Sequence, residues 1–165
     1  MFTWKYVDID TNEVDSIRQK YLDYFQITPP KLNFFQTCNI GIKTFLNMPV
    51  VKTSVIFLDG NKNGEIHEDI RPGGQTLALL IPLVNCNDSS TEIYESSVGP
   101  LLKLNAENKT YHFYEPANCK KIAEYLLTQP VLLNTSLPHC VFNHSNQQRI
   151  ALSICFETDP WHLTN

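Results

Sequence analysis

The chain of 165 residues lacks the features that would place it in a membrane or on a nucleic acid. No run of basic residues exceeds the pair Lys120 and Lys121, and 17 acidic against 13 basic side chains give a net charge of -4. The longest apolar run, from Leu77 to Val84 with Pro82 inside it, is far shorter than the roughly 20 residues that cross a bilayer. We therefore expect neither nucleic acid nor a membrane as a direct partner.

Signals for export and for disulfide bonding are also missing. The first 15 residues carry acidic side chains and have no apolar core, so they do not predict a secretion signal. The 5 cysteines are odd in number, widely spaced and never arranged as C-x-x-C. This pattern argues against a disulfide framework and against a zinc ribbon. We expect a reduced, cytoplasmic setting.

Helical periodicity occurs in two segments. Apolar side chains recur at helical spacing over residues 12–25, which predicts an amphipathic helix near the start of the chain. A second helix is predicted over residues 116–129, because Pro116 suits a first helical turn and Pro130 would end the helix.

Most of the remaining chain alternates short apolar segments with polar or proline-containing turns. The segment TLALLIPLV is apolar on both faces, which predicts a buried central strand, and the turn NCNDSS predicts a hairpin with the following TEIYE. Many short strands with flanking helices favour a mainly β fold, a jelly-roll or cupin-like barrel, over a doubly wound sheet. The expected strands lie at 50–60, near 65, and at 76–84, 91–95, 130–135, 137–143 and 149–156.

A triplet of the form H-x-D stands on one of these predicted strands. Side chains alternate between the two faces of a strand, so His67 and Asp69 share a face while Glu68 points away. Two histidines and one carboxylate are the usual ligands of non-haem iron(II). For the second histidine we choose His139, which lies in the strand-like LPHCVFN before a compact turn. The alternative to a metal site is that these residues form a solvated surface cluster.

Arg149 begins the last predicted strand. If strands 139–143 and 149–156 are antiparallel neighbours, the small and polar face that contains Arg149 looks into the barrel. A guanidinium is costly to bury unless an anion meets its planar fork, and a dicarboxylate co-substrate would be such an anion. Alternatively, Arg149 is an exposed residue paired with Glu157 or Asp159.

These features together resemble the 2-oxoglutarate/iron(II)-dependent dioxygenase superfamily, in which an H-x-D motif, a later histidine and an arginine about ten residues beyond it follow in this order. More narrowly, IHEDIRPGGQTLALLIPLVNCNDSSTEIYE and PHCVFNHSNQQRIALSI resemble small phage and bacterial oxygenases related to aspartyl/asparaginyl hydroxylases. The resemblance covers residues 50–156 and implies a double-stranded β-helix. We expect one domain over residues 1–165, with a helical region of about residues 1–48 packed on a β core of about residues 50–156.

The resemblance also assigns roles to side chains. Three residues would bind iron(II) and be catalytic, and Arg149 would pair with the distal carboxylate of 2-oxoglutarate. Where some members have a serine two residues after this arginine, the chain has Ala151, so the second anchor stays open between other polar residues. The expected site residues are, for the metal, His67, Asp69 and His139 and, for the co-substrate, Arg149, Ser153 and Thr91, with Tyr94 as a further candidate.

The implied activity is hydroxylation of an amino acid, a peptide or a small metabolite, with iron(II), 2-oxoglutarate and dioxygen as reactants and ascorbate as a reductant. The resemblance places it in the cytoplasm of a bacterial or phage-infected host cell. Two alternatives stay open. One is a cupin-type metal-dependent dioxygenase or isomerase that binds its substrate without 2-oxoglutarate. The other is a non-catalytic jelly-roll binding module in which the three candidate ligands never converge.

Overall fold

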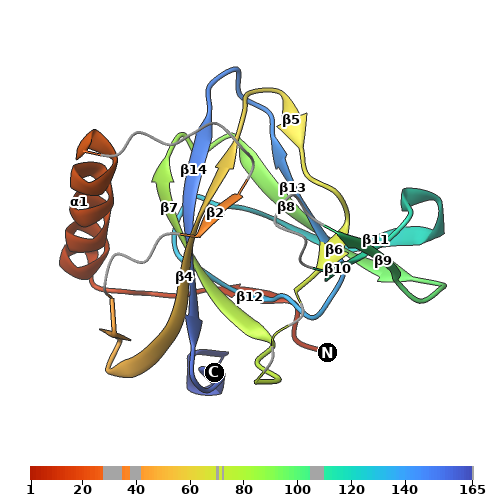
Figure 1. Ribbon diagram of the computed structural model, residues 1–165, viewed down its shortest axis with the longest axis horizontal. Coiled ribbons are helices and arrows are strands. Elements are labelled where there is room, and N and C mark those ends of the chain that lie inside the picture. Colours follow the sequence, from red (N-terminus) through yellow and green to blue (C-terminus); the bar gives the residue numbers. More distant parts are fainter. Residues whose placement is uncertain (28–34, 38–41, 70, 72, 105–109, 165) are drawn as a thin grey trace.

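Two antiparallel sheets form the body of the protein in the computed structural model, which describes residues 1–27, 35–37, 42–69, 71, 73–104 and 110–164 (Figure 1). The first sheet has the order β1-β12-β7-β14-β4-β2, with β3 paired to β4, and the second has the order β11-β8-β13-β6-β10-β9, with β5 paired to β13. The strands of the first sheet are β1 Trp4–Tyr6, β2 Phe35–Thr37, β3 Thr44–Phe45, β4 Met48–Leu58, β7 Leu77–Val84, β12 Val131–Asn134 and β14 Arg149–Phe156. Those of the second are β5 Lys62–Asn63, β6 His67–Glu68, β8 Ser89–Ser96, β9 Leu101–Leu104, β10 Thr110–Phe113, β11 Cys119–Leu126 and β13 His139–Asn143.

The space between the two sheets is filled by apolar side chains from both of them. Leu80, Val131 and Ala151 of the first sheet pack with Ile93 and Tyr125 of the second, and each is at most 5% exposed. Alternate residues of each strand therefore point into this interior. The arrangement is the mainly β jelly roll, or double-stranded β-helix, that the sequence predicts.

The helix α1, Thr11–Ile27, covers the outer face of the first sheet (Figure 1). It begins after Asp10, whose carboxylate accepts the backbone N–H of Asn12 at 2.8 Å and so caps the first turn. Its apolar stripe of Val14, Ile17 and Tyr21 is buried against outward side chains of the sheet. The helix predicted over residues 12–25 is confirmed. Within the described residues, no helix is long and apolar enough to traverse a membrane.

The second predicted helix is wrong. Residues 116–118 make only the short 3-10 turn η1, Pro116–Asn118, and the segment then continues as β11 along β8. Its side chains alternate, since Tyr125 is buried while Leu126 is 47% exposed. The two proline signals were read as helix boundaries, but a period of two and pairing with β8 decide the structure.

Two expected strand pairings are also wrong, for one topological reason. β7 pairs with β12 and β14, whereas β8 pairs with β11 and β13, so NCNDSS connects the two sheets and closes no hairpin. In the same way, β13 and β14 belong to opposite sheets. The chain crosses from one sheet to the other between β7 and β8 and again between β13 and β14, so these strands find their partners farther along the sequence. The short 3-10 turn η2, Trp161–Thr164, ends the described chain.

Candidate metal centre and buried arginine

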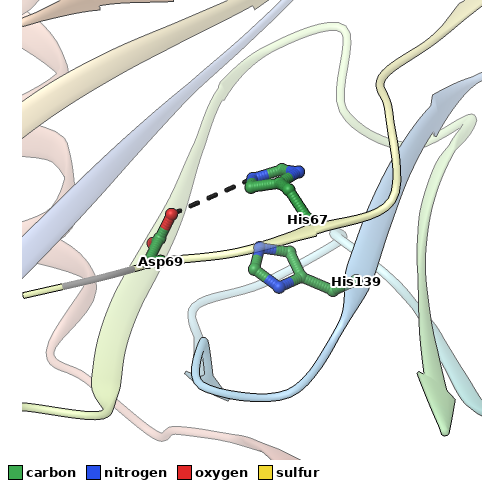
Figure 2. Close-up of side chains that lie close together, drawn as sticks. All are labelled: His67, Asp69 and His139. Atoms are coloured by element: carbon green, nitrogen blue, oxygen red, sulfur yellow. Dashed lines mark ion pairs between the residues drawn. The ribbon is translucent and has the colours of Figure 1, made fainter. Parts of the chain in front are cut away.

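Three candidate ligands meet at the inner side of the second sheet (Figure 2). β6 and β13 are paired with His67 opposite His139, and their imidazole centroids lie 4.5 Å apart. Asp69 follows directly after β6, and its Oδ1 lies 3.9 Å from Nε2 of His67. One ligand atom from each of the three residues lies within 4.8 Å of the others, a spacing from which they can hold a single ion. Of the three side chains His139 is buried, whereas those of His67 and Asp69 are 33% and 41% exposed.

The backbone around Asp69 explains why the carboxylate stays on this side. Its N–H donates to the carbonyl oxygen of Thr135 at 2.9 Å, and the N–H of Thr135 donates to Thr76 at 2.8 Å. The segment after β6 is therefore tied to the chain that leads into β13. Glu68 points the other way, as expected, and its carboxylate contacts His112 and Tyr114 on the outer face.

Both histidines present the same nitrogen to the centre. Nδ1 of His67 donates to the carbonyl oxygen of Glu65 at 2.9 Å, and Nδ1 of His139 donates to that of Leu137 at 2.9 Å. A carbonyl only accepts, so each Nδ1 carries the proton and each Nε2 keeps a lone pair for a metal. His139 is 5% exposed, and this burial, with the nearby His67, lowers its pKa to about 4. It is therefore a neutral imidazole at pH 7.

The carboxylate of Asp69 has one neighbour that sequence reasoning missed. Arg71 places Nη2 3.2 Å from Oδ2 of Asp69, and its Nη1 donates to the carbonyl oxygen of Leu77 at 2.6 Å. Burial raises the pKa of Asp69, but His139, His67 and Arg71 together outweigh it and hold the pKa below its usual value. Asp69 is therefore ionised at neutral pH. The sequence could have suggested this contact, because an arginine stands two residues after the H-x-D triplet.

Arg149 lies in the interior of the same barrel and is 1% exposed. Its Nε donates to Oγ of Ser89 at 2.9 Å, while its Nη1 has no hydrogen-bond partner among the described residues. Burial lowers the pKa of this guanidinium. The expected alternative, a surface pair with an acid, is wrong: Asp159 instead accepts the backbone N–H groups of Thr76 and Leu77 at 2.8 to 3.0 Å.

Two buried hydroxyls, like Nη1 of Arg149, lack a hydrogen-bond partner among the described residues. Thr91 and Tyr125 face each other across the β8 and β11 pair, close enough for their hydroxyls to interact, and within the described residues neither hydroxyl makes a hydrogen bond to any other group. Tyr125 is close enough to Arg149 for their charges to interact. Burial raises the pKa of Tyr125, so its hydroxyl stays protonated. Thr91 is thus in the interior, as expected, whereas Tyr125 was missed because its segment was read as a helix.

The remaining candidates divide between the two faces of the sheets. Ser153 is 8% exposed and lies on the inner face of β14 with Arg149, although the two strands expected to be neighbours there are not paired. Tyr94 is placed wrongly by the sequence: it points outward, packs with Tyr114 and Cys140, and donates to Glu92. It does not line the interior.

Comparisons with known proteins relate the chain to others by structure. No protein-family model matches it, and no curated protein matches it in sequence. It is similar to the epimerase SnoN in complex with Fe3+, alpha ketoglutarate and nogalamycin RO, with a TM-score of 0.59 and 10% identity over 92% of this chain and 77% of that one. A second SnoN structure, described as a non-heme alpha ketoglutarate dependent epimerase, gives 0.57 at 12% identity with the same coverage. The alpha ketoglutarate dependent carbocyclase SnoK gives 0.55 at 9% identity over 92% of this chain and 78% of that one. At such identities the likeness establishes the shared fold.

Proposed function

We propose that the protein is an iron(II)- and 2-oxoglutarate-dependent dioxygenase that hydroxylates an amino acid, a peptide or a small metabolite. One observation carries the proposal. Two imidazole nitrogens and a carboxylate oxygen come close enough to hold one ion, and the barrel that carries them also buries an arginine with an unpaired N–H. Each half fits one of the two reactants that such an enzyme needs.

The donor set fits iron(II). His67, Asp69 and His139 would fill three positions of an octahedral ion and leave three open. The hydrogen bonds from each Nδ1 to a backbone carbonyl fix the ring orientation and tautomer, as the outer partners of metal-bound histidines do. When bound, iron(II) and 2-oxoglutarate supply the oxidising chemistry, and the protein supplies the position of the reactants.

The buried polar atoms fit the distal carboxylate of 2-oxoglutarate. A buried donor without a partner costs about 1–3 kcal/mol, so leaving Nη1 of Arg149 unpaired needs a compensating ligand. A carboxylate would accept from Arg149 and from the hydroxyls of Thr91 and Tyr125, and Ser153 is a further hydroxyl on the inner face. Apolar neighbours such as Ala151 would keep water away from this end of the interior.

The alternatives account for less of the site. A cupin-type dioxygenase or isomerase without 2-oxoglutarate leaves the guanidinium of Arg149 without an anion. The binding-module alternative supposed that the three ligands never converge, and they do converge. A net charge of -4 with no basic run favours a small molecule or a peptide over nucleic acid as substrate, and a cytoplasmic setting remains part of the proposal.

The direct test uses purified protein with iron(II), ascorbate and 2-oxoglutarate, without substrate, and measures slow release of succinate. Titration with Co(II) measures metal binding separately. We expect His139→Ala to abolish Co(II) binding, and Arg149→Ala to keep Co(II) while weakening 2-oxoglutarate. The matched control is His144→Ala, because His144 is exposed and its ring contacts Ser90 and Phe142, which are not candidate ligands.

Two outcomes would contradict these roles. Equal loss of Co(II) in His139→Ala and Arg149→Ala would mean that the two residues do not act on different reactants. A wild-type protein that neither binds Co(II) nor releases succinate would remove the proposed function. A loss of metal in His144→Ala would point to unfolding.

A further inference from the structure

Arg71 joins the candidate metal centre to the start of β7, a central strand of the first sheet. Its guanidinium is held at two ends, with Nη1 2.6 Å from the carbonyl oxygen of Leu77 and Nη2 3.2 Å from Oδ2 of Asp69. The side chain of Arg71 is 11% exposed, whereas that of Asp69 is 41% exposed, so the bond to Leu77 is the more sheltered of the two. A planar guanidinium that binds two acceptors has little freedom to turn.

The anchor for Arg71 is itself rigid. Leu77 is the first residue of β7, a central strand of the first sheet, and is 0% exposed. The carboxylate of Asp159 accepts the N–H groups of Thr76 at 2.8 Å and of Leu77 at 2.9 Å, which ties this strand end to the end of the chain. Arg71 therefore holds Asp69 from a fixed point.

The two carboxylate oxygens of Asp69 face different neighbours. Oδ2 faces Arg71 at 3.2 Å, and Oδ1 faces Nε2 of His67 at 3.9 Å, which is the nitrogen that a metal would use. Carboxylates bind metals through one oxygen or through both. With the bond to Arg71 kept, Oδ2 is turned toward the guanidinium and Oδ1 is the oxygen placed for ligation.

We propose that Arg71 is a positioning residue that restricts Asp69 to one-oxygen ligation and so keeps a coordination position open for the co-substrate. This inference rests on the proposed function. Two histidine nitrogens and one carboxylate oxygen leave three positions of an octahedral ion, which suffice for a chelating 2-oxoglutarate and dioxygen. If Oδ2 also bound the metal, two positions would remain, and the chelating ligand would compete with the carboxylate.

The chain offers a matched control in Arg18. Its Nε donates to the carbonyl oxygen of Pro82 at 2.9 Å, and its Nη1 contacts Oδ1 of Asp15 at 3.1 Å. Arg18 therefore also joins an aspartate to a carbonyl of β7, but from α1 on the outer side of the sheet. Replacing it removes the same kinds of bond without touching the candidate metal ligands.

The test compares wild type with Arg71→Met, Arg71→Lys and Arg18→Met, using Co(II) in place of iron(II). Calorimetry measures the Kd of Co(II), then the Kd of 2-oxoglutarate for the Co(II)-loaded protein, and visible absorption of Co(II) reports its coordination. For Arg71→Met we expect 2-oxoglutarate binding to weaken by a larger factor than Co(II) binding does, by about 10- to 100-fold, because the second oxygen that joins the metal offsets the lost positioning of Asp69 only for Co(II). The Co(II) spectrum without 2-oxoglutarate should change, because a second carboxylate oxygen joins. Arg71→Lys should recover part of the 2-oxoglutarate affinity, and Arg18→Met should match wild type.

The results separate this inference from the function on which it rests. If Arg71→Met loses Co(II) and 2-oxoglutarate by the same factor, or binds both as wild type does, Arg71 does not set the denticity of Asp69 and the inference is overturned. If wild type binds no Co(II), the proposed function fails and the inference with it. Thermal unfolding of the metal-free variants checks the fold, and should Arg71→Met not fold, the same ratio of the two affinities is read from Arg71→Lys.

Discussion

Replacing Arg149 with methionine should make the protein more stable in the absence of 2-oxoglutarate and remove the stability that 2-oxoglutarate adds. The guanidinium is 1% exposed, its Nη1 has no partner in the described part of the chain, and its Nε donates to Oγ of Ser89. Ser89 does not depend on this bond, since its hydroxyl donates to the carbonyl oxygen of Cys86 at 2.9 Å. Methionine is long, flexible and apolar, so it can fill much of the space that the arginine leaves.

The size of the effect follows from three contributions. Removing the charge relieves its desolvation, which costs several kcal/mol per buried ion, and removes the unpaired Nη1, worth about 1–3 kcal/mol. The lost hydrogen bond to Ser89 takes back about 1.5–3 kcal/mol. We expect a net gain of about 1–4 kcal/mol in the free energy of unfolding, the range found when apolar residues replace buried ion pairs. Each kcal/mol would raise Tm by about 2–4 °C in a chain of this size.

The assay is urea unfolding of wild type and Arg149→Met, each loaded with Co(II), with and without 2-oxoglutarate. At a ligand concentration of 100 times Kd, wild type should gain about 2.7 kcal/mol from the co-substrate, and the variant should gain almost none. A variant that is less stable than wild type without the ligand would refute the account of an uncompensated buried charge. A variant that gains as much from 2-oxoglutarate as wild type would refute the role of Arg149 as its anchor.

Three further predictions concern other parts of the interior and one turn. The pKa of His139 is about 4 in the folded protein against an ordinary 6.5, so between these pH values the unfolded chain binds one proton more than the folded protein. Wild type should therefore lose on the order of 3 kcal/mol in the free energy of unfolding as pH falls from 6.5 to 4. Urea unfolding should find a smaller loss in His139→Gln. Tyr125→Phe should leave metal-free stability unchanged or higher and weaken 2-oxoglutarate about 2- to 12-fold by calorimetry, whereas unchanged affinity would exclude the hydroxyl from the pocket. Gly60→Ala would place a Cβ 2.4 Å from the backbone of Asn146 and should cost about 1–3 kcal/mol in urea unfolding, while Gly64→Ala, whose Cβ would lie 3.9 Å from the carbonyl oxygen of Val141, should cost less.

The sequence was informative where a local pattern coincides with a buried face. The apolar spacing of residues 12–25 predicted α1, because a helix on the surface of a sheet buries one stripe and exposes the rest. The H-x-D triplet placed His67 and Asp69 on one side for a similarly local reason, the alternation of side chains along an extended chain. Neither argument needed a knowledge of which strands are partners.

Local patterns failed where the outcome depends on strand partners. The segment of β11 has prolines at both ends and helix-compatible residues between them, and only its pairing with β8 makes it a strand. That error hid Tyr125, whose hydroxyl is expected in the interior once alternation along β11 is known. The interior position of Arg149 was predicted from a pairing with β13 that does not exist; the prediction of its face still held because the inner face of β14 is set by β4 and β7.

The proposed metal ligands and the proposed co-substrate anchor come from different sheets. His67 and His139 lie on adjacent strands of the second sheet, so one short-range pairing sets the distance between the metal ligands. Arg149 comes from the first sheet, so its place relative to the metal depends on how the two sheets pack on Leu80, Ile93 and the rest of the shared interior. A substitution that loosens this packing should therefore weaken 2-oxoglutarate binding before it weakens metal binding, because only the co-substrate would have to bridge the two sheets.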